Sequence, residues 1–204
     1  MREKTKRIIV RVSLFLVVGT LITANCQAGV YSIDTAHSSV EFAIKHLMVS
    51  TTKGKFVDYT GTIDVDPADF STAKIDVTIQ SKSIDTHVAD RDNHLRNADF
   101  LDAEKFPIIT FKSTTVTPVK AKDTCMITGD LTLHGVTKEV SVIVMFSGPV
   151  QSPLGAQVIG LSSEFTINRK DYGITQNKQM DNGGWMVGEE VNISVNIEAH
   201  EMKE

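Results

Sequence analysis

Apolar and polar residues alternate along most of the chain from Gly29 onward. Between Val191 and Ile197 every second residue is apolar, and between Ile159 and Ile167 the alternation has a single exception. A period of two gives an extended strand one dry face and one wet face, which is typical of antiparallel sheets. About eight strands with short connections predict a single all-β domain, either a barrel or a sandwich. Further stretches of this kind occupy residues 30–33, 40–44, 60–66, 74–81, 106–111, 124–133 and 139–146.

One segment, residues 83–111, interrupts this pattern with a short polar helix that we expect around residues 86–97. Asp85 or Thr86 is expected to cap it, because a short side-chain oxygen accepts a hydrogen bond from the free N–H groups of a first helical turn. Later in the chain, residues 140–146 are apolar on both faces. We therefore expect a cover on the outer face of that strand, and the helix is a candidate for it.

The expected helix would carry a cationic strip beside an apolar one. At about 100° per residue, His87, Arg91 and His94 share one side of the helix. Val88 and Leu95 lie next to them. Such a helix would suit a cover over an apolar molecule with a polar head. The alternative is a surface helix that docks two apolar side chains onto the domain, and the helix pattern by itself is compatible with both.

The first 28 residues resemble an export signal. Basic residues precede a short apolar run at 12–21, and Cys26-Gln27-Ala28 places small residues at the two positions that a signal peptidase reads. The run is short for a membrane span, and no second apolar run follows. We therefore expect residues 1–28 to be a cleaved signal peptide, and residues 29–204 to be a periplasmic domain without a membrane span. Attachment of a lipid to Cys26 is the alternative.

Net charge and cysteine content exclude several classes of protein. Loss of residues 1–28 removes five basic residues and one acidic residue, so the net charge at pH 7 changes from −4 to −8. An acidic surface argues against a nucleic-acid partner, whose phosphates require cationic contacts. Only Cys125 would remain, so stability must come from a buried core, which a chain of this length can form. Cys125 has no basic neighbour in the sequence and is predicted to be a small core residue.

The sequence contains no pattern typical of a catalyst or a metal centre. None of the six histidines has a partner at the spacing of a zinc-binding helix, and no cysteine pair accompanies them. His87 and His94 would lie about 10 Å apart along a helix, too far for one ion. The G-x-S-x-G turn of many serine hydrolases is absent. We therefore expect no enzymatic activity, no metal and no cofactor.

Five segments carry a combination of motifs that is specific as a set. They include D-x-x-H-S, R-D-x-H-L and L-T-x-H-G-V-T-K, and the segments are YSIDTAHSSVEFAIKHLMVSTTKGKF, SIDTHVADRDNHLRNADFLDAEKFPIITF, GDLTLHGVTKEV, INRKDYGI and GEEVNISVNIEAH. Over essentially the whole mature chain they resemble the YceI-like family of exported lipid-binding proteins. The resemblance implies a single antiparallel eight-stranded barrel of lipocalin-like shape, with a cavity for an isoprenoid chain or another lipid and no enzymatic activity. The loosely defined end of the signal peptide is a departure that concerns processing and leaves the fold unaffected.

The inward rows of the strands would line such a cavity. Arg91 and His94 are expected to contact the head group of the ligand at the mouth, with Asp92 orienting Arg91. The same rim could also include Arg169, Asp171 and Tyr172, or these three residues could pair within a turn. The apolar residues expected to bind the ligand chain are Phe42, Phe111, Leu131, Phe146, Leu161, Phe165 and Ile193.

The expected function is sequestration, storage or transport of a long-chain amphiphile in the periplasm. A polyprenyl phosphate or a quinone-like molecule would fit. At about 0.8 kcal/mol per buried CH₂, each five-carbon isoprene unit contributes up to about 4 kcal/mol, whereas a neutral hydrogen bond contributes only about 1 kcal/mol. Chain length would then set the affinity, and the head group would set the orientation. The alternative is a ligand-free stress-response or interaction module with a filled core. The sequence leaves open which lipid is bound, which protein delivers it and whether two copies form a homodimer.

Overall fold

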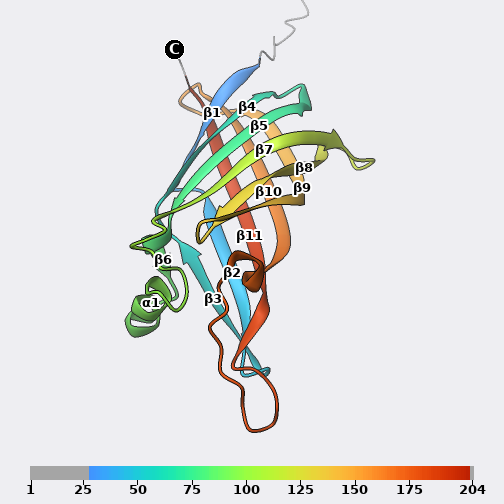
Figure 1. The fold of residues 1–204 in the computed structure, drawn as a ribbon. Helices are drawn as coiled ribbons and strands as arrows, with labels where there is room; N and C mark the ends of the chain where they lie inside the picture. Colours follow the sequence, from blue (N-terminus) through green and yellow to red (C-terminus); the bar gives the residue numbers. More distant parts are fainter. Residues whose placement is uncertain (1–27, 203–204) are drawn as a thin grey trace, which may run out of the picture.

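The computed structural model describes residues 28–202, which form eleven strands, one α-helix and two short 3-10 helices (Figure 1). The helical elements are η1 (Ser81–Ser83), α1 (Ala89–Arg96) and η2 (Arg169–Tyr172). The strands are β1 (Gly29–Ile33), β2 (Ser39–His46), β3 (Ser50–Phe56), β4 (Tyr59–Asp66), β5 (Asp69–Gln80), β6 (Ile84–Asp85), β7 (Ile108–Pro118), β8 (Thr124–Leu133), β9 (Val136–Gln151), β10 (Gln157–Asn168) and β11 (Val187–Glu201).

Eight antiparallel strands close into a barrel in the order β1-β4-β5-β7-β8-β9-β10-β11, and pairing between β1 and β11 completes the circle. The last three residues of β11 pair with β1, whereas residues 187–196 pair with β2. In the next position around the wall, β4 pairs with β1 and β3 pairs with β2. The segments β1-β2 and β3-β4 therefore each act as one wall strand with a break in the middle. The predicted antiparallel barrel of eight strands is confirmed.

The alternation in the sequence corresponds to the inner and outer faces of the barrel wall. The strands β10 and β11 pair along nearly their whole length, and this register places Phe165 opposite Ile193. Ile159 and Ala199 form another pair of the same inward rows and are completely buried. Cys125 is buried as predicted, and burial raises the pKa of its thiol.

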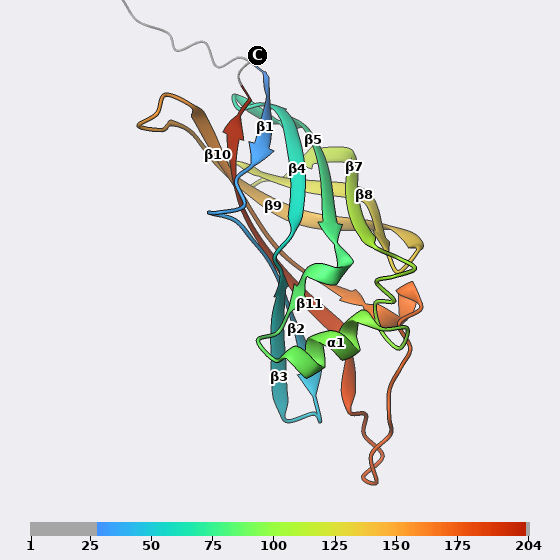
Figure 2. The same ribbon diagram turned by 90° about the vertical axis from the view of Figure 1, so that its left-hand side faces the viewer.

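Large apolar side chains pack closely together at one end of the barrel. Tyr31 and Ile63, which lie opposite each other on β1 and β4, are each 1% exposed. The rings of Phe70 and Phe146 stack in the same apolar cluster, with 4.5 Å between their centroids. The two ends of the described chain lie at this end of the barrel (Figure 1). The helix α1, the β2–β3 hairpin and the loop between η2 and β11 lie toward the opposite end (Figures 1 and 2).

The helix α1 begins later than the sequence predicted, and neither Asp85 nor Thr86 caps it. Its N-cap residue is Val88, whose side chain offers no acceptor. Before it, His87 has a left-handed φ of 62°, and its N–H donates to Asp85 Oδ1 at 2.8 Å. Thr86 is buried and bonds to Asp92 instead. The polar side chains that were expected to start the helix therefore hold the turn in front of it.

The predicted cover over residues 140–146 is wrong. The outward side chains Ile143 and Met145 of β9 are 51% and 58% exposed. The helix α1 is held elsewhere, against β6, because Arg96 donates to the carbonyls of Lys82 and Ile84, both at 2.7 Å. Among residues 28–202, no helix is long and apolar enough to cross a membrane.

Candidate functional site

A cavity of about 510 Å³ lies inside the barrel. Apolar side chains from β2, β5, β7, β8, β9, β10 and β11 form most of its wall. Small-molecule sites typically have volumes of about 300–1,000 Å³ and walls of this kind. An eight-stranded barrel has room for one small ligand where side chains leave its interior unfilled. The cavity is therefore the candidate site.

Six of the seven apolar residues predicted to line the cavity border it in the structure. These six are Phe42, Phe111, Leu131, Leu161, Phe165 and Ile193. Phe146 is not among the residues that border this cavity: it is 3% exposed and stacks on Phe70. A period of two tells that a side chain points inward, but it does not tell whether the barrel is hollow at that height.

Arg91 borders the cavity as predicted, but part of its hydrogen-bonding capacity is already used. Its Nε donates to Thr86 Oγ1 at 2.7 Å, and its Nη2 donates to the Thr86 carbonyl at 2.8 Å. The backbone N–H and the hydroxyl of Thr86 both donate to Asp92 Oδ1, at 2.9 and 2.5 Å. Asp92 therefore orients Arg91 through Thr86.

The carboxyl group of Asp92 is buried yet charged. Burial opposes its ionisation, but the hydrogen bonds from Thr86 and the nearby charges of Arg96 and Arg91 outweigh burial and hold its pKa below the usual range. The low pKa keeps the carboxyl group ionised, and an ionised carboxylate accepts stronger hydrogen bonds than a protonated one. The hydrogen bonds that position α1 are therefore stronger than they would be with a neutral Asp92.

His94 also borders the cavity, whereas His87 does not. The Nε2 of His94 lies 3.2 Å from Asp99 Oδ2, and its ring packs edge-on against Phe100 with 5.0 Å between centroids. His87 is exposed beside Asp85. The predicted strip of three basic side chains on one side of the helix is thus reduced to two, because His87 precedes the helix. A ligand-binding role for Arg91 and His94 stays a prediction.

Arg169, whose role the sequence left open, opens η2, borders the cavity and is only 3% exposed. Its Nε donates to the Gly188 carbonyl at 2.8 Å, and its Nη1 donates to the carbonyls of Ile174 and Gln176 at 2.7 and 2.9 Å. Its buried Nη2 has no hydrogen-bond partner among the described residues. Burial lowers the pKa of Arg169, and the negative charge of Glu189 opposes this shift. Nothing in the sequence indicated that Arg169 would be buried, because a long basic side chain at the start of a turn is usually solvated.

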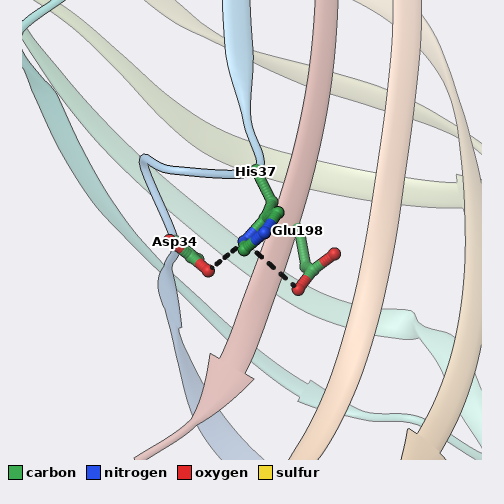
Figure 3. Close-up of side chains that lie close together, drawn as sticks. All are labelled: Asp34, His37 and Glu198. Atoms are coloured by element: carbon green, nitrogen blue, oxygen red, sulfur yellow. Dashed lines mark hydrogen bonds and ion pairs between the residues drawn. The ribbon is translucent and has the colours of Figure 1, made fainter. Parts of the chain in front are cut away.

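A separate cluster of ionisable side chains lies at the break between β1 and β2 (Figure 3). The Nδ1 of His37 lies 2.7 Å from Asp34 Oδ2 and 4.0 Å from Glu198 Oε1, which in turn lies 2.8 Å from His200 Nε2. The hydrogen bond between Asp34 and His37 lowers the pKa of the carboxyl and raises the pKa of the imidazole. Ligand atoms of Asp34, His37 and Glu198 lie within 4.8 Å of one another, close enough for one metal ion.

This cluster has a structural role that needs no ion. The Asp34 N–H donates to the Glu198 carbonyl at 2.8 Å, and the Ser38 hydroxyl donates to the same carbonyl at 3.2 Å. The cluster therefore ties the broken wall strand to β11. Spacing along the sequence could not reveal it, because Asp34 and Glu198 come from opposite ends of the domain.

The chain is similar in sequence and in structure to several known proteins. The UPF0312 protein SA2479 of Staphylococcus aureus (strain N315) is 42% identical over 169 residues, which cover 82% of this chain and 95% of that protein. The crystal structure of the Campylobacter jejuni YCEI protein is similar with a TM-score of 0.67 and 33% identity, covering 78% of this chain and 90% of that one.

A polyisoprenoid binding domain from Saccharophagus degradans, implicated in plant cell wall breakdown, is similar with a TM-score of 0.64. It covers 86% of this chain and 100% of its own, and at 14% identity the likeness shows the fold alone. The model of the YceI-like domain matches residues 31–199. Together with the closed barrel and the relatives above, this match shows that the chain belongs to the YceI-like family.

Proposed function

We propose that the protein binds an isoprenoid-type molecule or another long-chain amphiphile in the barrel cavity, and that it stores or carries this lipid without catalysing a reaction. The apolar cavity of about 510 Å³ is the observation that carries the proposal. A barrel filled with side chains, as in an interaction module without a ligand, would leave no such space. The S. degradans domain of the same fold is named for polyisoprenoid binding, which supports the same class of ligand.

The wall of the cavity favours a ligand that is mostly hydrocarbon. At about 0.8 kcal/mol per buried CH₂, each five-carbon isoprene unit contributes up to about 4 kcal/mol. The measured affinity will be lower than the sum, because immobilising the chain has an entropic cost. Arg91 and His94, both in α1, border the same cavity, and we expect them to contact a polar head. The hydrocarbon chain would then supply most of the affinity.

Organic extraction of the purified protein, followed by mass spectrometry, tests the proposal. We expect a long-chain amphiphile in the extract of the wild type and none in the extract of Phe165→Arg, because an unpaired charge in an apolar cavity costs several kcal/mol. Thr166→Arg is the matched control, since Thr166 is the next residue of β10 and its side chain is exposed. It should retain the lipid.

Two results would contradict lipid binding. One is a wild-type protein that releases no lipid and binds no added isoprenoid. The other is a Phe165→Arg variant that keeps the circular dichroism spectrum of the wild type and still carries its lipid.

Export to the periplasm is part of the same proposal, although residues 1–27 lie outside the described residues. We expect the mature chain to begin at Gly29, since Ala28 ends a small-residue cleavage site. The intact mass of protein from a periplasmic fraction checks this. A mass that includes residues 1–28, or a diacylglyceryl group on Cys26, would refute it.

A further inference from the structure

Side chains of the kinds that bind metal ions meet at the break between β1 and β2. They are Asp34, His37, Glu198 and His200. Figure 3 shows three of them, with Asp34 and His37 in the link between the two strands and Glu198 on β11. These residues do not border the lipid cavity. The cluster is therefore a site of its own, and an inference about it goes beyond the lipid-binding function proposed above.

The spacing of the ligand atoms suits a single ion. Ligand atoms of Asp34, His37 and Glu198 lie within 4.8 Å of one another. The Nδ1 of His37 lies 2.7 Å from Asp34 Oδ2 and 4.0 Å from Glu198 Oε1. The Nε2 of His200 lies 3.7 and 2.8 Å from the same two oxygens. Zinc bonds of about 2.0–2.2 Å place the ligands of a tetrahedral site about 3.3 Å apart, so each of these distances lies within about 1 Å of the value required.

The charge and the donor atoms of the cluster indicate the kind of ion. Among residues 28–202, the basic groups within 4 Å of the Asp34 and Glu198 carboxylates are the imidazoles of His37 and His200, not a lysine or an arginine. Two carboxylates with two neutral imidazoles match the charge of one divalent cation. Imidazole nitrogen suits zinc and similar transition metals, whereas Mg²⁺ and Ca²⁺ prefer ligands that are all oxygen. The ligand set therefore favours a zinc-like ion.

Hydrogen bonds hold these ligands in position before an ion arrives. The His37 N–H donates to the Asp34 carbonyl at 3.3 Å, and the Ala36 N–H donates to Asp34 Oδ1 at 2.9 Å. The turn therefore fixes Asp34 next to His37 and leaves Oδ2 as the oxygen nearer to the imidazole. Such second contacts orient the ligands of metal sites. The His37 side chain is 65% exposed, so an ion reaches the cluster from solvent without opening the barrel wall.

We propose that the cluster binds one zinc-like divalent transition-metal ion, with the ligands Asp34, His37, Glu198 and His200. The ion would join the link between β1 and β2 to β11, which pairs with both strands, and would stabilise the barrel where its wall strand is broken. The proposal replaces the expectation of no metal, which rested on the spacing of histidines along the sequence. That spacing could not reveal a site whose ligands come from opposite ends of the domain.

Isothermal titration calorimetry with ZnCl₂ tests the proposal on protein that carries no affinity tag and has been treated with EDTA. We expect one ion to bind per chain with a Kd of about 1 μM or lower, and no comparable binding of MgCl₂ or CaCl₂. Zinc at about 100 times its Kd should raise the melting temperature by about 5–10 °C. The visible spectrum with CoCl₂ gives a second readout, because tetrahedral Co²⁺ absorbs far more strongly than hydrated Co²⁺.

Substitutions identify the ligands. His37→Gln and Glu198→Gln should each weaken zinc binding at least about 10-fold, because even the loss of a residue that only supports a ligand has an effect of that size. The rise in melting temperature at a fixed zinc concentration should shrink accordingly. His87→Gln is the matched control, since His87 is also an exposed histidine beside an aspartate, with its Nδ1 3.5 Å from Asp85 Oδ1. It should leave zinc binding unchanged.

Three results would overturn the proposal. They are a wild type that neither binds nor is stabilised by zinc, a wild type that binds Mg²⁺ as tightly as Zn²⁺, and folded His37→Gln and Glu198→Gln variants with the zinc affinity of the wild type. Where one of these variants does not fold, Asp34→Asn and His200→Gln give the same comparison. Because the cluster lies outside the cavity, EDTA should leave the extracted lipid unchanged, so this inference and lipid binding can fail separately.

Discussion

The substitution Asp92→Ala tests how the helix beside the cavity is held in place. Asp92 is 6% exposed, and Thr86 donates to its carboxylate from both the backbone N–H and the hydroxyl. Each hydrogen bond to a charged group is worth about 1.5–3 kcal/mol, and both donors would be left buried. Taking the low end for each bond, we expect the free energy of unfolding to fall by about 3 kcal/mol. In a domain of this size the melting temperature would fall by roughly 6–12 °C.

Urea unfolding of the lipid-free protein, followed by circular dichroism, measures this loss. Asp90→Ala is the matched control, because Asp90 lies in the same first turn of α1, is exposed and makes no ion pair among the described residues. It shares the favourable interaction with the helix dipole, so its loss should cost about 0.5 kcal/mol. The difference between the two variants isolates the bonds to Thr86.

A result of equal cost for Asp92→Ala and Asp90→Ala would refute this reasoning. It would mean that packing alone holds the segment before α1, and that Arg91 is not oriented by the Thr86–Asp92 pair.

Two further predictions concern the cavity mouth and the barrel wall. Arg91→Ala combined with His94→Ala should lower the stability of the lipid-free protein by about 1–2 kcal/mol, through loss of the bonds to the segment before α1. Urea unfolding of the lipid-free protein checks this, and an unchanged stability would count against it. In the Asp34–His37 pair, the lowered pKa of Asp34 gives stability that is lost as pH falls through that pKa, and the raised pKa of His37 gives stability that is lost as pH rises through it. The wild type should therefore melt at a higher temperature than His37→Gln, and the difference should be largest between about pH 4 and about pH 6.5, which are the pKa values of Asp and His in an unfolded chain. A difference that grows in alkali would contradict this prediction.

The sequence by itself determined the fold class and most of the cavity wall. The period of two in β10 and β11 can bury one row of side chains only if Phe165 and Ile193 point inward. The same local rule placed Cys125 in the core. These features depend on backbone geometry that repeats along each strand, so they can be predicted without knowing what lies across the barrel.

The tertiary structure decided where the barrel is hollow and which charges are compensated. Phe146 and Phe165 are both inward residues, but Phe146 meets Phe70 across the barrel, whereas Phe165 borders the cavity. Arg169 lies in a motif that also fits a solvated turn, and its burial follows from carbonyls of the next loop and of β11 that lie against it. The start of α1 likewise depends on Thr86 bonding inward rather than to the helix. The contact between Phe70 and Phe146 joins strands distant in the sequence. The contacts of Arg169 and Thr86 depend on how the chain turns back on itself, which the period of a strand or a helix does not encode.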